Sequence, residues 1–193
     1  NLTFAAAIKT FLRQDPDIIL VGEIRDNETA EAAIQASLTG HLVLSTLHTN
    51  DSPTAIARLI EMEVEPFLIS SSLAVVIGQR LVRKTCPHCQ EEVSADDYIK
   101  STFLRAGIEI NSYIKGKGCS NCFNTGYRGR IGIFEMLEIT DSLRSLINKR
   151  ASSYDIKEAA RKEGFRTMFE YGAELVKKGI TTPSEVLSVT KVD

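Results

Sequence analysis

The chain has 193 residues, of which 43% are hydrophobic and 25% charged, a composition that is ordinary for globular proteins and excludes an intrinsically disordered chain. No apolar run approaches the ~18 residues that a membrane-spanning helix needs, and no signal peptide opens the sequence, so we expect a cytoplasmic chain. The net charge of -2 conceals a change of sign: acidic side chains prevail in residues 1–79, basic ones prevail in 80–130, and the two balance in 131–193. We therefore expect three parts with these boundaries.

The first part shows the alternation of helices and strands that is typical of a parallel sheet. Apolar residues at helical spacing predict a helix over 3–14, which Pro16 ends because proline disfavours helical geometry in the residue before it. Short apolar runs at 18–22 and 41–46 predict two strands buried on both faces, and a second helix is predicted between them over 27–39. This order of elements favours an α/β fold with a right-handed crossover.

The rest of the chain predicts further helices, interrupted by one segment rich in cysteine and glycine. Two helices are expected at 52–62 and 66–79, and a strand at 129–139, where polar and apolar residues alternate. Glycines interrupt any long element between 86 and 129, which leaves room for a short helix near 95–106. Capping residues and apolar spacing predict the remaining helices at 141–150, 154–163, 167–178 and 183–190.

Polar side chains follow both predicted strands of the first part. Glu23 comes directly after the run at 18–22, and His48 follows the run at 41–46 closely. Because open parallel sheets bind ligands at the carboxyl ends of their strands, we expect these side chains at one edge. An acid there can hold magnesium through water, and a polar neighbour can sense a γ-phosphate, which indicates a nucleotide hydrolase of the RecA type. The alternative is that Glu23 and His48 are ordinary loop residues beyond strands.

Four cysteines form two CxxC pairs, Cys86 with Cys89 and Cys119 with Cys122. Two such pairs can offer four thiolates to one tetrahedral zinc, which would leave no open position for catalysis. The competing interpretations are two disulfides, which a cytoplasmic chain disfavours, and four unrelated thiols. We expect His88, inside the first pair, to be exposed rather than a ligand. The basic residues here also suit a nucleic-acid-binding zinc protein, although no interleaved basic and aromatic stripe supports that function.

Several long motifs resemble, in order, those of the ATPases of type II secretion and type IV pilus assembly. The Walker B and histidine-box region of that family is similar to residues 12–51, LRQDPDIILVGEIRDNETAEAAIQASLTGHLVLSTLHTND. Its zinc-bearing subdomain is similar to residues 79–89, QRLVRKTCPHC, to the paired cysteines, and to residues 126–137, GYRGRIGIFEML. The resemblance runs from about residue 2 to 190. It implies a partial RecA-like P-loop NTPase domain with a parallel sheet, a tetracysteine zinc subdomain at 80–130 and a helical C-terminal extension.

The resemblance also implies roles for individual residues. Glu23 matches the Walker B acid that helps to organise Mg²⁺, and His41 and His48 match the two histidines of the histidine box. His48 would be the one nearer the γ-phosphate, coupling the state of the nucleotide to movement between domains. Arg25 and Asp26 complete the GEIRD motif, which implies a structural or switch role for both. The four cysteines match the zinc ligands of the family.

The chain departs from the family pattern in one respect, because it contains no phosphate-binding loop of the form G-x-x-x-x-G-K-[ST]. Its only Gly-Lys pair, Gly116-Lys117, follows Asn111 where the loop needs a glycine and precedes Gly118 where the loop needs Ser or Thr. The aspartate box of the family and the arginines of its preceding domain are also expected upstream of residue 1. We therefore expect the C-terminal part of an ATPase, inactive by itself.

For the parent protein the resemblance implies hydrolysis of ATP with Mg²⁺ by a homo-hexamer at the cytoplasmic side of the inner membrane. Its partners would be the inner-membrane platform proteins of the secretion or pilus machine, and Zn²⁺ would be structural. Two functions from other classes stay open. One is a stand-alone zinc-containing interaction module without catalysis, and the other is a nucleic-acid-binding zinc protein.

Overall fold

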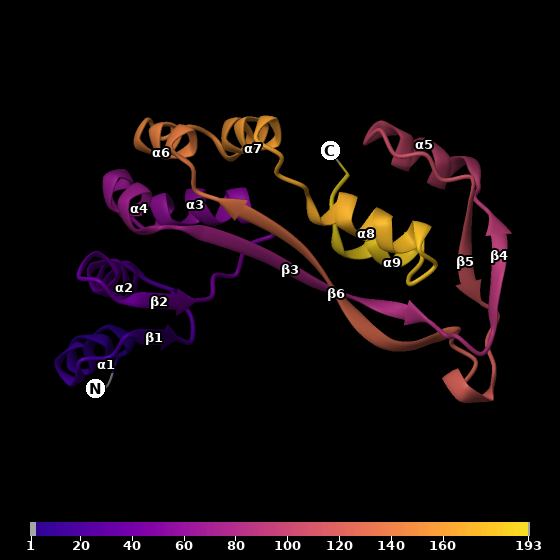
Figure 1. Ribbon diagram of the computed structural model, residues 1–193, viewed down its shortest axis with the longest axis horizontal. Coiled ribbons are helices and arrows are strands. Elements are labelled where there is room, and N and C mark those ends of the chain that lie inside the picture. Colours follow the sequence, from indigo (N-terminus) through magenta and orange to yellow (C-terminus); the bar gives the residue numbers. More distant parts are fainter. Residues whose placement is uncertain (1–2, 193) are drawn as a thin grey trace. The chain divides into compact units, whose positions relative to one another are not determined.

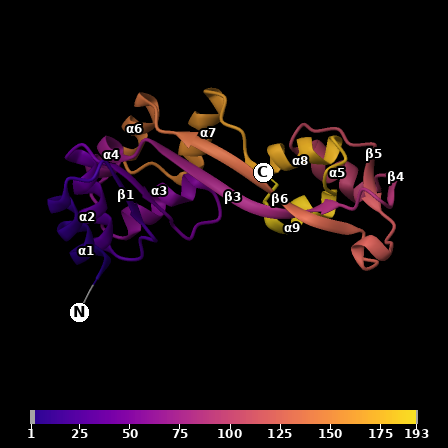
Figure 2. The same cartoon turned by 60° about the horizontal axis from the view of Figure 1, so that its bottom comes forward.

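The computed structural model describes residues 3–192, which form two compact units (Figures 1 and 2). The first unit extends to Ile77 and includes Met136–Phe165, and the second holds Gly78–Glu135 and the chain from Arg166 onward. These units cut across the three parts expected from charge and motifs, whose boundaries after residues 79 and 130 stay a prediction.

The elements of the first unit are α1 (Phe4–Phe11), a 3-10 turn (Leu12–Gln14), β1 (Ile18–Val21), α2 (Asn27–Leu38), β2 (Leu42–Ser45), α3 (Ser52–Glu61), α4 (Pro66–Ser72), α6 (Asp141–Asn148) and α7 (Ser153–Lys162). Two long strands, β3 (Val75–Thr85) and β6 (Tyr127–Glu138), pair with each other and continue from the first unit into the second. The remaining elements of the second unit are β4 (Gln90–Ser94), α5 (Asp97–Arg105), β5 (Ser112–Gly116), a 3-10 turn (Ser120–Cys122), α8 (Met168–Lys177) and α9 (Pro183–Val189).

β1 and β2 form a parallel pair, in register from Ile18 opposite Leu42 to Val21 opposite Ser45. α2 supplies the connection between them that a parallel pair requires (Figure 1). α1 and α2 bury their small and apolar side chains together with those of β1, including Ile19. The predicted α/β class with a parallel sheet is therefore confirmed.

The other face of this strand pair is exposed, and the prediction of strands buried on both faces was wrong. Leu20 is 74% exposed and Ile18 60%, while Leu42 and Leu44 are exposed by about half, at 55% and 48%. The physical reason is that α1 and α2 cover only the face to which Ile19 belongs, and among residues 3–192 no second layer covers the opposite face. A continuous apolar run shows that both faces of a strand could be buried, but it does not show that other elements pack on both faces.

The predicted helix over 66–79 was also wrong in its second half, because α4 ends at Ser72 and β3 begins at Val75. Ser71 and Ser72 donate their hydroxyls to the carbonyls of Phe67 and Leu68, one turn back, which weakens the preference for continuing a helix. The following Val75-Val76-Ile77 is β-branched throughout and pairs with β6 instead.

Besides the cluster formed by α1, α2 and β1, the first unit has a larger hydrophobic cluster, surrounded by α2, α3, α4, α6 and α7. Ile56 of α3, Ile69 of α4 and Ile147 of α6 are completely buried in it, and Leu137 and Ile139 from the end of β6 and the residues after it fill its centre. α6 and α7 begin close to the predicted positions, because Thr140 and Ser152 cap them with side-chain oxygens. Ile24 and Leu47, which follow β1 and β2, pack against this cluster, so it anchors the chain beyond the ends of both strands.

The second unit packs α5, α8 and α9 around a second cluster, in which the rings of Phe103 and Phe169 lie 4.9 Å apart. β4 and β5, which α5 connects, form an antiparallel pair with Gln90 opposite Gly116, in the segment where the sequence indicated only loops and a short helix. Neither unit, within the described residues, contains a helix that is both long and apolar enough to cross a membrane.

Candidate functional site

The structure brings Glu23, Arg25 and His48 together at the carboxyl ends of β1 and β2. His48 Nε2 lies 3.1 Å from Glu23 Oε2, and Arg25 Nε lies 2.6 Å from the same oxygen. Within residues 3–192 no hydrogen bond is seen to the second oxygen, Oε1. One carboxylate oxygen is therefore shared between two donors from different strand ends, and within the described residues the other has no hydrogen-bond partner.

A tight turn presents His48 to this edge. The N–H of Thr49 donates to the carbonyl of Leu47 at 3.1 Å, which makes His48 the central residue of a three-residue turn. Such a turn directs the middle side chain outward, and that of His48 is 82% exposed. Leu47 packs against the larger hydrophobic cluster of the first unit, which anchors the first residue of the turn.

Arg25 stabilises the ionised form of Glu23. The hydrogen bond from Arg25 is the largest influence on the pKa of Glu23, partial burial opposes it, and the positive charge of Arg25 and the bond from His48 add to it. Together they hold the pKa of this carboxyl below its ordinary value of 4.5. Glu23 is therefore a carboxylate at neutral pH, as a group that binds a hydrated divalent cation must be.

Asp26 lies outside this group of contacts and caps a helix. Its Oδ1 accepts the N–H of Thr29 at 2.8 Å at the start of α2, and this backbone bond, with a further bond from the Thr29 side chain, lowers the pKa of Asp26. Asp51 caps α3 in a similar way, because its Oδ1 accepts the N–H of Thr54 at 2.9 Å. Asp26 and Asp51 are thus used to start helices, and of these three acids only Glu23 contacts His48 at the edge of the sheet.

His41 is placed at the opposite end of β2 from His48. Its Nδ1 lies 2.9 Å from the carbonyl of Ala36 and 3.2 Å from the hydroxyl of Thr39. Because a carbonyl only accepts, Nδ1 carries the proton, and the ring secures the turn between α2 and β2. Four strand residues separate the two histidines, a span of ~13 Å at the rise of a β-strand, so His41 is not brought to Glu23. The roles predicted for His41, Arg25 and Asp26 stay predictions.

The four cysteines of the second unit form one cluster. Their sulfurs all lie within 4.8 Å of one another, with 3.9 Å from Cys86 to Cys119, 3.9 Å from Cys89 to Cys122 and 3.7 Å from Cys119 to Cys122. A disulfide would need about 2.05 Å, so all four are free thiols. A tetrahedral zinc with sulfur ligands at about 2.3 Å requires sulfurs about 3.8 Å apart, and the cluster fits that requirement.

Backbone N–H groups surround one of these sulfurs. Burial acts to raise the pKa of the Cys122 thiol, but the N–H bonds from Cys119 and Gly126, at 3.2 and 3.3 Å, and the neighbouring thiols outweigh it and lower the pKa to about 6. Burial and the thiols of the other three cysteines raise the pKa of Cys89, against a bond from the backbone N–H of Gly118. Four adjacent thiols cannot all ionise without a cation, so the donor set is one that a bound divalent metal would complete.

Two glycines that the sequence reasoning did not single out close this cluster. A Cβ on Gly116 would lie 2.1 Å from the carbonyl oxygen of Gly126, and a Cβ on Gly126 would lie 2.5 Å from that of Gly116. Gly126 also accepts the N–H of Cys86 at 2.9 Å, so it contacts both CxxC pairs through its backbone. The clue in the sequence is the density of glycine beside the second pair, which indicates close backbone approach.

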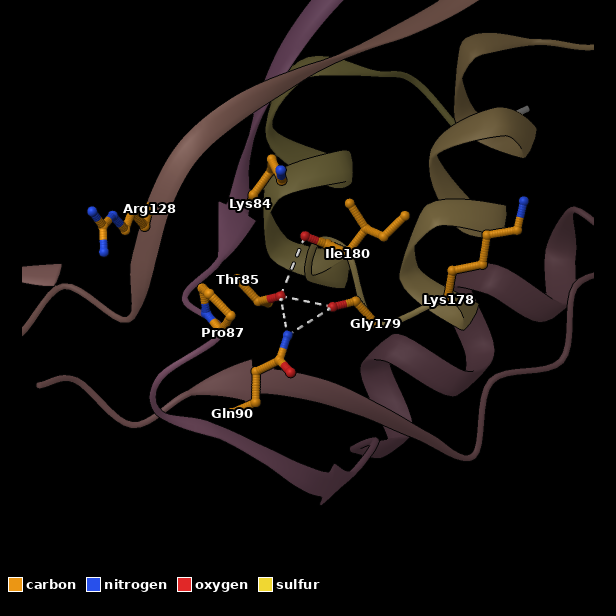
Figure 3. A pocket seen from close by; sticks show the side chains of 8 residues that line it. All are labelled: Lys84, Thr85, Pro87, Gln90, Arg128, Lys178, Gly179 and Ile180. Atoms are coloured by element: carbon orange, nitrogen blue, oxygen red, sulfur yellow. Dashed lines mark hydrogen bonds between the residues drawn. The ribbon is translucent and has the colours of Figure 1, made fainter. Parts of the chain in front are cut away.

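The second unit also contains a shallow hollow of about 440 Å³ beside the first CxxC pair (Figure 3). It is lined by Lys84, Thr85, Pro87, Gln90, Arg128, Lys178, Gly179 and Ile180. Thr85 donates to the carbonyl of Gly179 at 2.7 Å and accepts from Gln90 at 3.1 Å, so these polar groups bond to one another. The three cationic side chains point in different directions in Figure 3 and do not converge on one point. We therefore interpret the hollow as a structural junction.

The sequence matches, over residues 1–188, the family described as "Type II/IV secretion system protein". It is 52% identical to the type IV pilus assembly ATPase PilB of Thermus thermophilus, covering 98% of this chain and 22% of that protein. It is 47% identical to the type II secretion system ATPase E of Vibrio cholerae, covering 99% of this chain and 38% of that protein. The chain thus spans well under half the length of these relatives.

Solved structures share the fold of this chain. The pilus retraction motor PilT with bound ADP superposes with a TM-score of 0.67 at 26% identity, over 97% of this chain and 43% of that one. The Legionella pneumophila ATPase DotB shares the fold with a TM-score of 0.64 at 22% identity, over 97% and 42%.

Proposed function

Because the chain belongs to the type II/IV secretion system protein family, we propose that it is the C-terminal part of an ATP-hydrolysing motor for type II secretion or type IV pilus assembly. The observation that carries this proposal is the edge formed by Glu23 and His48 at the carboxyl ends of two parallel strands. Relatives that align with almost the whole chain are named as ATPases of these two machines.

Each residue at the edge has a task in this proposal. Glu23, ionised and with Oε1 not engaged by the described residues, would hold the water shell of magnesium, and His48 would contact the γ-phosphate from the neighbouring strand end. Magnesium, when bound, neutralises charge on the β- and γ-phosphates. Arg25 would fix one oxygen of Glu23 and stabilise its ionised form, and Asp26 caps the start of α2. The phosphate-binding loop would come from the remainder of the parent protein.

The tetracysteine cluster would hold one structural Zn²⁺. Four thiolates complete its coordination sphere, which leaves no position for substrate, so the metal would stabilise the second unit rather than react. We further propose that the parent is a homo-hexamer, peripheral to the cytoplasmic face of the inner membrane, whose partners are the inner-membrane platform proteins of its machine. The names of the relatives support a motor of this kind, and the assembly itself is a proposal.

The function is tested in the full-length protein that contains this chain. We expect Glu23→Gln to abolish the release of phosphate from ATP while nucleotide still binds, because the glutamine amide lacks the negative charge of the carboxylate. Glu31→Gln, on the exposed face of α2, is the matched control and should behave as the wild type. A Glu23→Gln protein that releases phosphate at the rate of the control would contradict the proposal.

A further inference from the structure

Thr46 joins the ends of the two parallel strands through its side chain and its backbone. Its hydroxyl donates to the carbonyl of Gly22 at 2.7 Å, and its own carbonyl accepts the N–H of Ile24 at 3.0 Å. Gly22 and Ile24 are the two neighbours of Glu23 in the chain. A single residue of one strand end therefore holds the backbone on both sides of the carboxylate on the other.

The hydroxyl extends the pairing beyond the strands themselves. The last residues paired as strands are Val21 and Ser45, so the sheet alone does not fix the backbone at Glu23. Ile24 is anchored as well, because its side chain packs against both hydrophobic clusters of the first unit. With Ile24 held by the core and by Thr46, the carbonyl of Gly22 is the remaining point at which the backbone can shift, and the hydroxyl of Thr46 secures it.

We propose that Thr46 is a positioning residue that sets the carboxylate of Glu23 relative to His48 and thereby controls turnover; this inference rests on the proposed ATPase function. Thr46 precedes the turn at Leu47–Thr49 that presents His48, so the bond to Gly22 couples the positions of both functional side chains. Small displacements of a catalytic group lower the rate of the chemical step more than they weaken substrate binding.

The test compares Thr46→Val with Thr46→Ser. Valine keeps the β-branched shape and removes the donor, whereas serine keeps the donor. In the full-length protein we expect Thr46→Val to lower kcat about tenfold with KM for ATP nearly unchanged, and Thr46→Ser to restore most of the rate. Thr10→Val removes a comparable exposed bond, from the Thr10 hydroxyl to the carbonyl of Ala6 in α1, and serves as the control for loss of a hydroxyl.

A second readout does not depend on ATP hydrolysis. In this chain, nuclear magnetic resonance can follow the titration of the Glu23 carboxyl, and Thr46→Val should move its midpoint upward, toward the ordinary value for glutamate, because the carboxylate leaves its partners. Thr46→Ser and Thr10→Val should leave the midpoint in place. An unchanged midpoint together with wild-type kcat in Thr46→Val would overturn the inference, as would a Thr46→Ser protein as slow as Thr46→Val. Failure of the ATPase function would instead appear as an active Glu23→Gln protein.

Discussion

At the scale of the residue, one oxygen of Glu23 contacts both Arg25 and His48. The two partners differ in charge and in exposure. Arg25 is always charged, and its hydrogen bond and charge stabilise the ionised form of the carboxylate. His48 is highly exposed and sits at the tip of a turn, so it is the partner that can change its contact when a phosphate arrives. The two side chains should therefore respond differently to mutation.

We predict that His48→Ala in the full-length protein lowers kcat by more than it weakens nucleotide binding. A side chain that contacts the γ-phosphate acts on the closing step before the reaction, so its loss appears mainly in turnover. His88→Ala, which alters an exposed histidine beside the cysteine cluster, is the control. Steady-state kinetics and equilibrium nucleotide binding would be measured for both variants. Turnover of His48→Ala equal to that of His88→Ala would leave His48 an ordinary loop residue.

We also predict that Arg25→Ala raises the pKa of Glu23 toward 4.5, because the hydrogen bond and the charge that lower it are lost. Since the folded-state pKa is depressed, the contribution of this pair to the free energy of unfolding is present above the ordinary pKa and is lost as pH falls through the folded value. The difference in stability between wild type and Arg25→Ala should therefore be constant near neutral pH and vanish in acid. Denaturant unfolding at several pH values measures it. A difference that persists unchanged below the folded pKa would contradict this assignment.

At the scale of the element, the sequence predicted most helices and the parallel pair, because local signals determine them. Helical spacing and the caps Thr140 and Thr182 position α6 and α9 within a residue or two. Local signals failed for β3, where an apolar stretch of helical appearance becomes a strand through pairing with the distant β6. Partners of this kind lie far along the chain, and no local pattern identifies them.

The site divides in the same way between what local sequence indicates and what only the fold shows. Glu23 and the cysteines could be located from motifs, since chemistry at those positions requires particular residue types. The task of Thr46 could not be predicted, because a threonine between a strand and a histidine carries no signal of its own. Its bond to Gly22 exists only through the register of β1 and β2.

The cysteine cluster gives a prediction for the segment that contains β4, α5 and β5. We expect one zinc per chain, and we expect chelation or Cys122→Ser to lower the protection of residues 86–126, most of all around the four cysteines, because metal binding supplies much of the local folding free energy there while α5 stays packed against α8 and α9. The strands β1 and β2 should stay folded. Elemental analysis combined with amide hydrogen exchange measures both effects, and Ser120→Ala, which changes a residue between two ligands without removing a thiol, is the control. A metal-free chain in which residues 86–126 stay protected would refute the zinc assignment.

At the scale of the whole molecule, the proposed function gives the chain one edge of a nucleotide site, and its sequence has no phosphate-binding loop. Positioning of the γ-phosphoryl group and electrostatic stabilisation account for nearly all of the catalysis in phosphoryl transfer, and the groups at Glu23 and His48 supply only a part of both. The molecule described by residues 3–192 should therefore be stable in its two units and yet catalytically incomplete.

We predict accordingly that the purified chain does not release phosphate from ATP in the presence of magnesium. Its Glu23→Gln variant is the matched control, because any turnover that belongs to this edge must disappear with the charge of that carboxylate. A coupled phosphate-release assay on both proteins decides the question. Turnover by the chain that survives further purification and is lost in the variant would show that the 193 residues suffice.

The contact between Gly116 and Gly126 has a consequence for how this protein tolerates random change. Alanine at either position meets a backbone oxygen of the other, and backbone atoms cannot step aside as the end of a flexible side chain can. Every other residue is at least as large as alanine, so we expect both positions to accept essentially only glycine. Neither glycine offers a metal ligand or a functional group. In a saturation survey scored by growth or secretion, these two positions should be as intolerant as the cysteines, and an investigator who equates intolerance with chemistry would misassign them.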